Sequence, residues 1–288
     1  MKILVTGGTG FIGSYLIKTL QEKGYETVCF GRNKPKDNDL PFVQGDIRNK
    51  DDILKAVKGV DAVVHLIVSV SSNDFKANND INVLGAKNLV EACKKNKVRK
   101  IIFTSSVVAM LENKDNYGMT KVQAEEVFQR SGLDITILRL ATVYGKGGKG
   151  YTKMVKNVTA VPFVIPLIGN GKYERQPVYV EDVVETILKV LERDNTVGRT
   201  YYLAGETISY REMLTVISKQ LGVKKIFLPV PAVLWKGLGL VLENIVKNPP
   251  MSKRDITSTM AEAVFDDDSA DELGFRKRKF EEGAKKSS

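Results

Sequence analysis

The sequence has few of the residues that form disulfides or metal sites. Its 288 residues include two cysteines, one histidine and one tryptophan. No group of Cys, His, Asp and Glu has metal-ligand spacing, so the sequence predicts neither a disulfide framework nor a bound metal. Cys29 and Cys93 lie in an apolar run and a helical pattern. We therefore expect both to be core residues of a cytoplasmic protein, where thiols stay reduced.

Long apolar stretches are also absent. No uncharged apolar run approaches the roughly 18 residues of a membrane-spanning helix. The N-terminus has no basic region in front of an apolar core, so we expect no signal peptide. Hydrophobic residues make up 43% of the chain and charged residues 27%, which is typical of a globular protein with a sizeable core.

The formal net charge of +10 raises the question of an anionic partner. Lysines and arginines are interleaved with acids, and only residues 94–100 and 276–279 are densely basic. No aromatic residues interleave with these runs, so we expect no nucleic-acid partner. We interpret the excess of basic residues as a solvated surface, with attraction of anionic ligands as the alternative. Residues 276–286 are expected to be a solvated tail.

Apolar runs typical of strands alternate with helical patterns over the first half of the chain. The strand-like runs are residues 2–6, 25–30, 41–45, 61–68, 100–106 and 134–140, and the helical ones 13–23, 50–58, 80–95 and 117–130. This alternation predicts an α/β fold with right-handed βαβ units around a parallel sheet. The runs at 61–68 and 100–106 are almost continuously apolar, as in strands buried on both faces.

The regular alternation of strand-like and helical segments ends after Gly145. A glycine-rich loop at 145–150 and a proline-broken apolar segment at 161–171 precede a strand and helix at 176–192 and a strand at 200–205. A helix at 209–221, a strand at 224–229, an apolar helix at 232–246 and the tail follow. We predict a dinucleotide-binding domain, 1–150 with 176–204, and a smaller substrate-binding lobe, 151–175 with 205–288. The apolar helix forms the lobe's core, covers the substrate or faces a partner.

The segment TGGTGFIG (6–13) follows the first strand and opens the first helix. Gly7 permits a tight turn, Gly10 permits close approach of a pyrophosphate, and Gly13 permits close packing of helix on strand. The amides and positive dipole at the helix N-terminus favour phosphate. The segment therefore predicts a dinucleotide site in a Rossmann-type, doubly wound parallel sheet.

The end of the second strand bears on the choice between NADP and NAD. An acid usually binds the ribose 2′-hydroxyl there, but the stretch CFGRNK (29–34) has no acid and contains Arg32 and Lys34. An arginine fork suits a 2′-phosphate. We favour NADP as the cofactor. The alternative is NAD, in which case Arg32 is an ordinary surface residue.

Tyr117 and Lys121 are four residues apart and so share one face of a helix. Tyrosine is a weak base at neutral pH, but a nearby ammonium favours its phenolate. The pair can then exchange a proton with a substrate hydroxyl or carbonyl. The hydroxyl of Ser106 could orient that oxygen, with Ser105 as its rival. His65, the one histidine, lies in an apolar strand and is expected to pack there without acting as a base.

Seven segments in order resemble the extended branch of the short-chain dehydrogenase/reductase superfamily. They are TGGTGFIG (6–13), GDIRN (45–49), NVLGAKNLVEAC (82–93), FTSS (103–106), YGMTK (117–121), LRLATVYG (138–145) and QPVYVEDVV (176–184). The resemblance implies that Asp46 binds adenine, Asn82 is structural and Lys121 holds the nicotinamide ribose. It implies the catalytic set Ser106, Tyr117 and Lys121. The implied cofactor-binding set is Gly7, Thr9, Gly10, Phe11, Ile12, Gly13, Arg32, Asp46, Ile47, Leu66, Tyr117, Lys121, Thr142 and Val143.

Two departures from the family pattern bear on function. Only ten residues separate Ser106 from Tyr117, and Leu140 stands where many relatives have proline. These features resemble a subgroup related to the NADPH-binding accessory subunit of respiratory complex I. The first hypothesis is an oxidoreductase or epimerase acting on a hydroxyl-bearing small molecule, with a nucleotide sugar as one candidate. The alternative is a non-catalytic, NADPH-binding scaffold or assembly protein. The sequence leaves the oligomeric state open.

Overall fold

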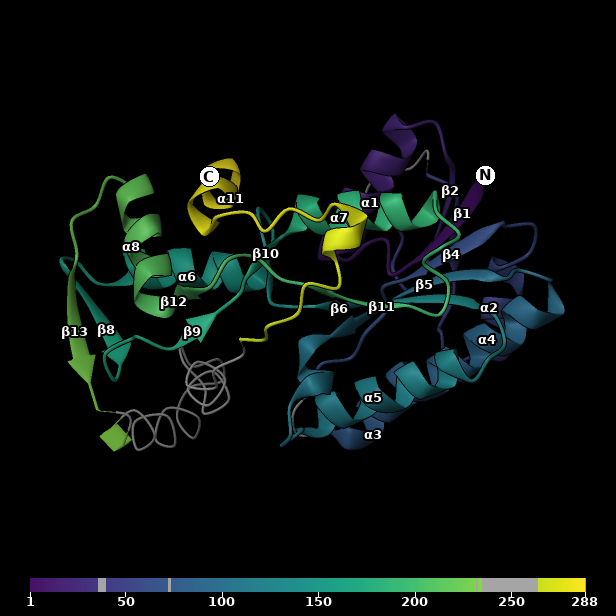
Figure 1. Cartoon of the computed structure of the whole chain (residues 1–288), viewed down its shortest axis with the longest axis horizontal. Coiled ribbons are helices and arrows are strands. Elements are labelled where there is room, and N and C mark those ends of the chain that lie inside the picture. The colour runs from purple at the N-terminus through teal and green to yellow at the C-terminus, as the bar shows by residue number, and fades with distance from the viewer. Residues whose placement is uncertain (36–39, 72–73, 232, 235–263, 288) are drawn as a thin grey trace. The chain divides into compact units, whose positions relative to one another are not determined.

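The alternating strands and helices assemble as two units in the computed structural model, which describes residues 1–35, 40–71, 74–231, 233–234 and 264–287 (Figure 1). The larger unit comprises residues 1–141, 180–203 and 267–276, and the smaller unit comprises 142–179, 204–266 and 277–288. The functions assigned to the two predicted domains stay predictions.

A parallel sheet of seven strands forms the larger unit, in the order β11-β6-β5-β4-β1-β2-β3. The first strand lies in the interior of the sheet, and the strand order reverses between it and β4. This is the doubly wound arrangement, in which ligands bind at the carboxyl ends of the strands beside the reversal. The strands are β1 (Lys2–Thr6), β2 (Glu26–Gly31), β3 (Phe42–Gln44), β4 (Ala62–His65), β5 (Lys100–Ser106), β6 (Asp134–Leu140) and β11 (Thr200–Leu203).

Helices cover both faces of this sheet, which is why its central strands are apolar throughout. All four residues of β4 and the middle five of β5 are buried. Figure 1 shows α1 and α7 on one face and α2, α4 and α5 on the other. The helices are α1 (Phe11–Glu22), α2 (Lys50–Ala56), α3 (Phe75–Asn78), α4 (Gly85–Lys95), α5 (Asn116–Gln129) and α7 (Val180–Leu191), with short 3₁₀ helices at Val107–Met110 and Asp271–Leu273.

The predicted α/β fold with a Rossmann-type sheet is confirmed, and so is the burial of Cys29 and Cys93. Two predicted boundaries were wrong. The strand predicted at 61–68 ends at His65, because the chain then leaves the sheet and Ser69 pairs with Asn82. The helix predicted at 80–95 begins instead with α3 and a π-helical turn, Asn79–Leu84, which leads into α4.

Three short two-stranded sheets and three helices make up the described part of the smaller unit. Its strands are β7 (Val143–Tyr144), β8 (Val164–Ile168), β9 (Glu174–Arg175), β10 (Val178–Tyr179), β12 (Ile208–Ser209) and β13 (Ile226–Val230). They pair as β7 with β10, β9 with β12, and β8 with β13. The helices are α6 (Lys149–Ala160), α8 (Tyr210–Gln220) and α11 (Phe280–Ser287).

The sequence analysis missed α6, whose N-cap is Gly148 at the end of the glycine-rich loop. It also failed at the C-terminus, where the expected solvated tail is wrong. Residues 280–287 form α11, which packs against α8 and β10. Phe280 and Ala284 are buried one helical turn apart, and their carbonyl oxygens accept hydrogen bonds from Tyr144 and Tyr151. The apolar stripe was missed in the sequence because it is short and charged residues surround it.

The apolar helix expected at 232–246 falls almost entirely outside the described residues. Among the helices that the structure does describe, none combines the length and the apolarity needed to cross a bilayer.

Candidate functional site

The turn between β1 and α1 has room for backbone but not for side chains. Gly7 has a φ of +77°, in the left-handed region that favours glycine. A Cβ placed on Gly7 would lie 3.1 Å from the backbone nitrogen of Ile67, just beyond β4. A Cβ on Gly13 would lie 2.4 Å from the carbonyl oxygen of Gly7. Glycine is therefore required where this turn packs against α1 and the end of β4.

This turn fits the pyrophosphate of a dinucleotide. Gly10 is the N-cap of α1 and brings no capping side chain, and the first intrahelical bond there runs from the Ser14 amide to Gly10. The amides of Phe11, Ile12 and Gly13 thus lack helical acceptors, and the positive end of the helix dipole lies with them. Thr9 is exposed on the same turn.

Leu66 lies beside this turn, at the carboxyl end of β4. Its amide donates to the carbonyl oxygen of Thr6 at 3.1 Å. The candidate residues of the first turn and Leu66 are therefore brought together at the reversal of strand order, where a doubly wound sheet binds its ligand.

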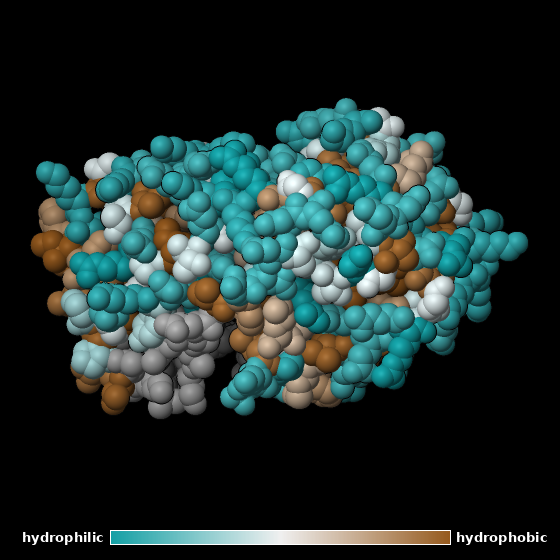
Figure 2. All heavy atoms as spheres, viewed as in Figure 1, coloured by the Kyte–Doolittle hydropathy of each residue, from teal (hydrophilic) through white to brown (hydrophobic). Residues whose placement is uncertain are grey.

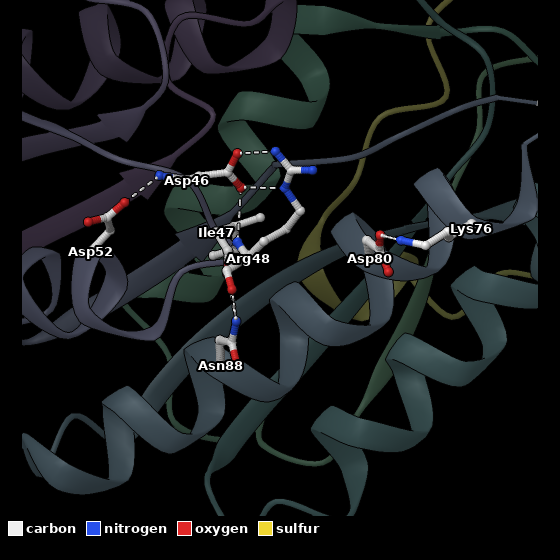
Figure 3. Close-up of polar contacts among 7 residues, drawn as sticks. All are labelled: Asp46, Ile47, Arg48, Asp52, Lys76, Asp80 and Asn88. Atoms are coloured by element: carbon white, nitrogen blue, oxygen red, sulfur yellow. Dashed lines mark hydrogen bonds and ion pairs between the residues drawn. The ribbon is translucent and has the colours of Figure 1, made fainter.

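Asp46 follows β3 and is held by Arg48, as Figure 3 shows. Arg48 Nε and Nη2 donate to the two carboxylate oxygens of Asp46 at 2.9 and 2.6 Å. The backbone amide of Asp46 in turn donates to Asp52 Oδ2 at 3.0 Å. Sequence reasoning missed Arg48, although it lies in the GDIRN segment two residues beyond Asp46.

Ile47, between these two residues, is almost fully buried, and its carbonyl oxygen accepts a hydrogen bond from Asn88 at 3.0 Å. An open surface pocket of about 730 Å³ lies at this segment. Its lining is mostly charged and consists of Asp46, Arg48, Asn49, Lys50, Lys76, Asp80 and Leu84.

Arg32 lies one residue beyond β2 and is exposed. Its carbonyl oxygen accepts a hydrogen bond from Gln44 Nε2 at 3.2 Å, which ties its backbone to the end of β3. Hydrogen bonds from Arg48 lower the pKa of Asp46 below its usual value, and the charge of Arg32 adds to that effect. The Arg32 side chain is thus near enough to Asp46 to influence it.

Tyr117 and Lys121 lie one turn apart on α5. The helix begins after Asp115, whose side chain caps it by accepting the Gly118 amide at 2.8 Å. Tyr117 is half-buried in the first turn, whereas Lys121 is 2% exposed. Asn82 donates to Thr120 Oγ1 at 3.0 Å and pairs with Ser69, so it connects α5 to the segment after β4.

Two residues of β5 hold the Lys121 ammonium group. Its Nζ donates to the Thr104 carbonyl oxygen at 2.8 Å and lies 4.3 Å from the centroid of the Phe103 ring. Burial lowers the pKa of Lys121 to about 7, against the opposing charge of Glu125 one turn further along α5. The charged form of Lys121 is therefore less favoured here than on an exposed lysine. Sequence reasoning assigned no part to Phe103 or Thr104, although both lie in the FTSS segment.

The structure separates Ser106 from its rival. Ser105 is buried, and its Oγ has no partner among the residues that the structure describes. Ser106 ends β5 and is half-buried, and its Oγ accepts the Val108 amide at 3.5 Å. The greater exposure of Ser106 favours it over Ser105 as the hydroxyl that meets a ligand.

His65 is buried at the end of β4. Its Nδ1 shares a hydrogen bond of 2.7 Å with Thr6 Oγ1, and its ring stacks on Phe103. Burial, and then the charge of Lys121, lowers the pKa of His65 to about 3. The ring is neutral across the physiological range and packs in the core as expected. That it does not act as a base stays a prediction.

Thr142 and Val143 belong to the smaller unit, where Val143 pairs with Val178 in the β7–β10 sheet. Thr142 is exposed, and its carbonyl oxygen accepts the Val178 amide at 3.0 Å. The other candidate residues all lie in the larger unit.

Comparison with known proteins identifies the family to which the chain belongs. The family model described as the NAD dependent epimerase/dehydratase family matches residues 3–204. The chain belongs to this family. The match covers the glycine-rich turn, the Asp46 segment, β5 and the Tyr117–Lys121 pair.

Three relatives illustrate the range of this family. The chain is 33% identical over 258 residues to a "Putative UDP-glucose 4-epimerase" from Methanocaldococcus jannaschii, covering 76% of this chain and 82% of that protein. It is 27% identical to the mitochondrial NADH-ubiquinone oxidoreductase 40 kDa subunit of Neurospora crassa, covering 91% and 71%. The crystal structure of Thermotoga maritima UDP-glucose 4-epimerase with UDP-glucose has a TM-score of 0.79, 24% identity and coverage of 100% and 97%. That structural similarity supports the fold.

Proposed function

We propose that this protein is an NAD(P)-dependent oxidoreductase that epimerises a nucleotide sugar by removing and returning a hydride. The observation that carries the proposal is the buried ammonium of Lys121, held by β5 one helical turn from Tyr117. The relatives named as UDP-glucose 4-epimerases support the substrate class.

A nicotinamide ring, when bound, supplies the acceptor and later the donor of the hydride. The protein's part is to move a proton and to hold the ligands. Tyr117 takes the proton of the substrate hydroxyl as its carbon loses hydride, and returns it when the carbonyl is reduced. Lys121 favours the phenolate by its charge and binds ribose hydroxyls, and Ser106 donates to the substrate oxygen. Because hydride and proton both return to the substrate, the reaction has no net oxidant or reductant, and Tyr117 ends with the protonation state with which it began.

For the adenosine end, we propose that the ligand is NADP(H). No acid stands between Cys29 and Lys34, and the exposed Arg32 lies where β2 ends. Known structures of similar fold are described with NAD, so this preference depends on Arg32 and on the missing acid at the end of β2. Asp46, Ile47 and the amides of residues 11–13 would hold the adenosine and pyrophosphate.

The decisive experiment is Tyr117→Phe, which removes one oxygen and leaves the ring. UDP-linked and dTDP-linked hexoses would be incubated with the protein and NADP or NAD, and the products separated by chromatography. We expect epimerisation to fall by roughly two to four orders of magnitude, while NADPH affinity stays within a few-fold. Tyr25→Phe is the matched control, since Tyr25 is half-buried like Tyr117 and donates its hydroxyl to Glu192 in a different part of the larger unit. Near-parent turnover by Tyr117→Phe would show that the mechanism is wrong.

A second candidate function is a non-catalytic, NADPH-binding scaffold. The resemblance to the oxidoreductase subunit spans 91% of this chain, against 76% for the epimerase-named relative. The segment between Ser106 and Tyr117 is short, with one turn of 3₁₀ helix and five further residues before α5. Tight NADPH binding without turnover of any nucleotide sugar, ketone or aldehyde would favour this function.

A further inference from the structure

The net positive charge of the chain belongs to the smaller unit. That unit holds 19 of the 44 lysines and arginines but only 9 of the 34 aspartates and glutamates. It therefore carries the whole net charge of +10, and the larger unit has a net charge of zero. Two stretches of the smaller unit, residues 142–173 and 213–234, contain no acid at all.

These two acid-free stretches meet at one end of the smaller unit. The loop from α6 to β8 lies beside the loop from α8 to β13, because β8 and β13 pair from Val164 and Ile226 onward. The Ile226 amide donates to the Phe163 carbonyl oxygen at 2.7 Å, and Lys225 Nζ donates to the Val161 carbonyl oxygen at 2.6 Å. We call this end the basic edge, comprising Val161, Phe163, Leu221, Lys224, Lys225, Ile226 and Leu228.

The basic edge exposes apolar side chains beside its two lysines. Phe163 is 75% exposed and Ile226 69%, and Leu228, two residues further along β13 on the same face, is 53% exposed. Figure 2 shows hydrophobic residues gathered over the part of the smaller unit where β13 and β8 lie. Clustered exposed apolar residues of this kind mark interaction surfaces.

The backbone at Phe163 adds a second observation. Its φ is +62°, a left-handed conformation that is uncommon and strained for a bulky residue. The strained backbone presents an aromatic ring to the outside, at a loop tip where glycine or asparagine would be easier to accommodate. Strain of this kind clusters at functional positions.

We propose that the basic edge docks on the surface of an anionic lipid bilayer. The exposed apolar side chains enter the boundary between headgroups and acyl chains, while Lys224 and Lys225 stay at headgroup level. The absence of acids from both stretches removes repulsion by an anionic surface. A nucleic acid fits this edge less well, because it has one exposed aromatic ring and no arginine for stacking.

Vesicle cosedimentation of the full chain, without cofactor, tests this proposal independently of catalysis. The probes are phosphatidylcholine vesicles with and without 30% phosphatidylglycerol. We expect binding to the anionic vesicles that weakens in high salt. Lys224→Gln with Lys225→Gln should lower the partition coefficient roughly 30-fold, since each lysine near such a surface contributes about fivefold. Phe163→Asn, which tolerates the left-handed backbone, should lower it about tenfold.

Two control variants keep the test specific. Lys94→Gln with Lys95→Gln removes the same charge from the exposed end of α4, and Val197→Asn removes an exposed apolar side chain of the larger unit. Both should bind like the parent protein. Equal losses for test and control pairs, or no preference for anionic vesicles, would overturn the proposal. Loss of heparin or RNA retention in the Lys224/Lys225 variant, without vesicle binding by the parent, would likewise overturn it and assign the edge to a polyanion.

Discussion

Replacing Lys121 with methionine should remove a specific pH dependence of stability. Lys121 is 2% exposed, and its folded-state pKa is about 7 instead of the ordinary 10.5. Between these two pH values the unfolded chain binds a proton that the folded chain has released. The free energy of unfolding must therefore rise with pH across this window, and the penalty for burying the charge is greatest below pH 7.

The size of this effect follows from the two pKa values. Raising the pH from 7 to 9 should increase the free energy of unfolding by about 2 kcal/mol through this one group. Methionine fills a similar volume and has no titrating group, so Lys121→Met should lack this contribution. Changes from all other groups are common to both proteins, so they cancel in the difference.

Urea unfolding of the parent protein and of Lys121→Met at pH 7, 8 and 9 measures that difference. Lys18→Met serves as the control, because the Lys18 side chain is 77% exposed on α1, and it should follow the parent at every pH. A stability difference between parent and Lys121→Met that stays constant from pH 7 to 9 would mean that the lysine is not desolvated. The account of the site in which β5 holds a buried ammonium would then be wrong.

Two further predictions concern the adenosine end and the C-terminus. Arg32→Ala should lower the affinity for NADPH about one to two orders of magnitude more than the affinity for NADH, because charge-assisted bonds to a 2′-phosphate are lost. Fluorescence titration with both cofactors measures the two affinities, and Arg130→Ala, at an exposed position, is the control. Equal losses of affinity for NADPH and NADH would contradict the NADP assignment. Phe280→Ala should lower the free energy of unfolding by about 3 kcal/mol, since the ring is 3% exposed and 4.7 Å from Tyr144. Lys285→Ala should change it little, and urea unfolding that showed no loss for Phe280→Ala would contradict the packing of α11.

Local patterns in the sequence predicted most elements of the larger unit, apart from the boundaries at the end of β4 and the start of α4. Its strands are short apolar runs between helices of ordinary length, and parallel βαβ units leave few ways to arrange them. The glycines at 7 and 13 were interpretable because their roles depend on backbone geometry within one turn. Tyr117 and Lys121 were predicted to share a helix face from their spacing alone, and α5 places them so.

The smaller unit was harder to predict, because its elements are short and its pairings are not local. The helix α6 has a weak start at glycine, and α11 has an apolar stripe of only two residues among charges. What buries Phe280 is Tyr144, 136 residues earlier in the chain. No pattern within a window of residues carries that information.

The sequence by itself determined the family and the fold of the sheet, because these depend on spacing along one strand or helix. The same spacing predicted the site residues, whose roles stay predictions. Only the tertiary structure decided the pKa values of the ionisable groups in the site. The pKa of Lys121 is low because tertiary packing buries its ammonium group, although the Thr104 carbonyl oxygen and the Phe103 ring both favour the charged form. The pKa of Asp46 is low because the Arg48 side chain hydrogen-bonds to its carboxylate. Burial and charge pairing arise from atoms that meet in space, so a linear pattern of residues cannot give their magnitude.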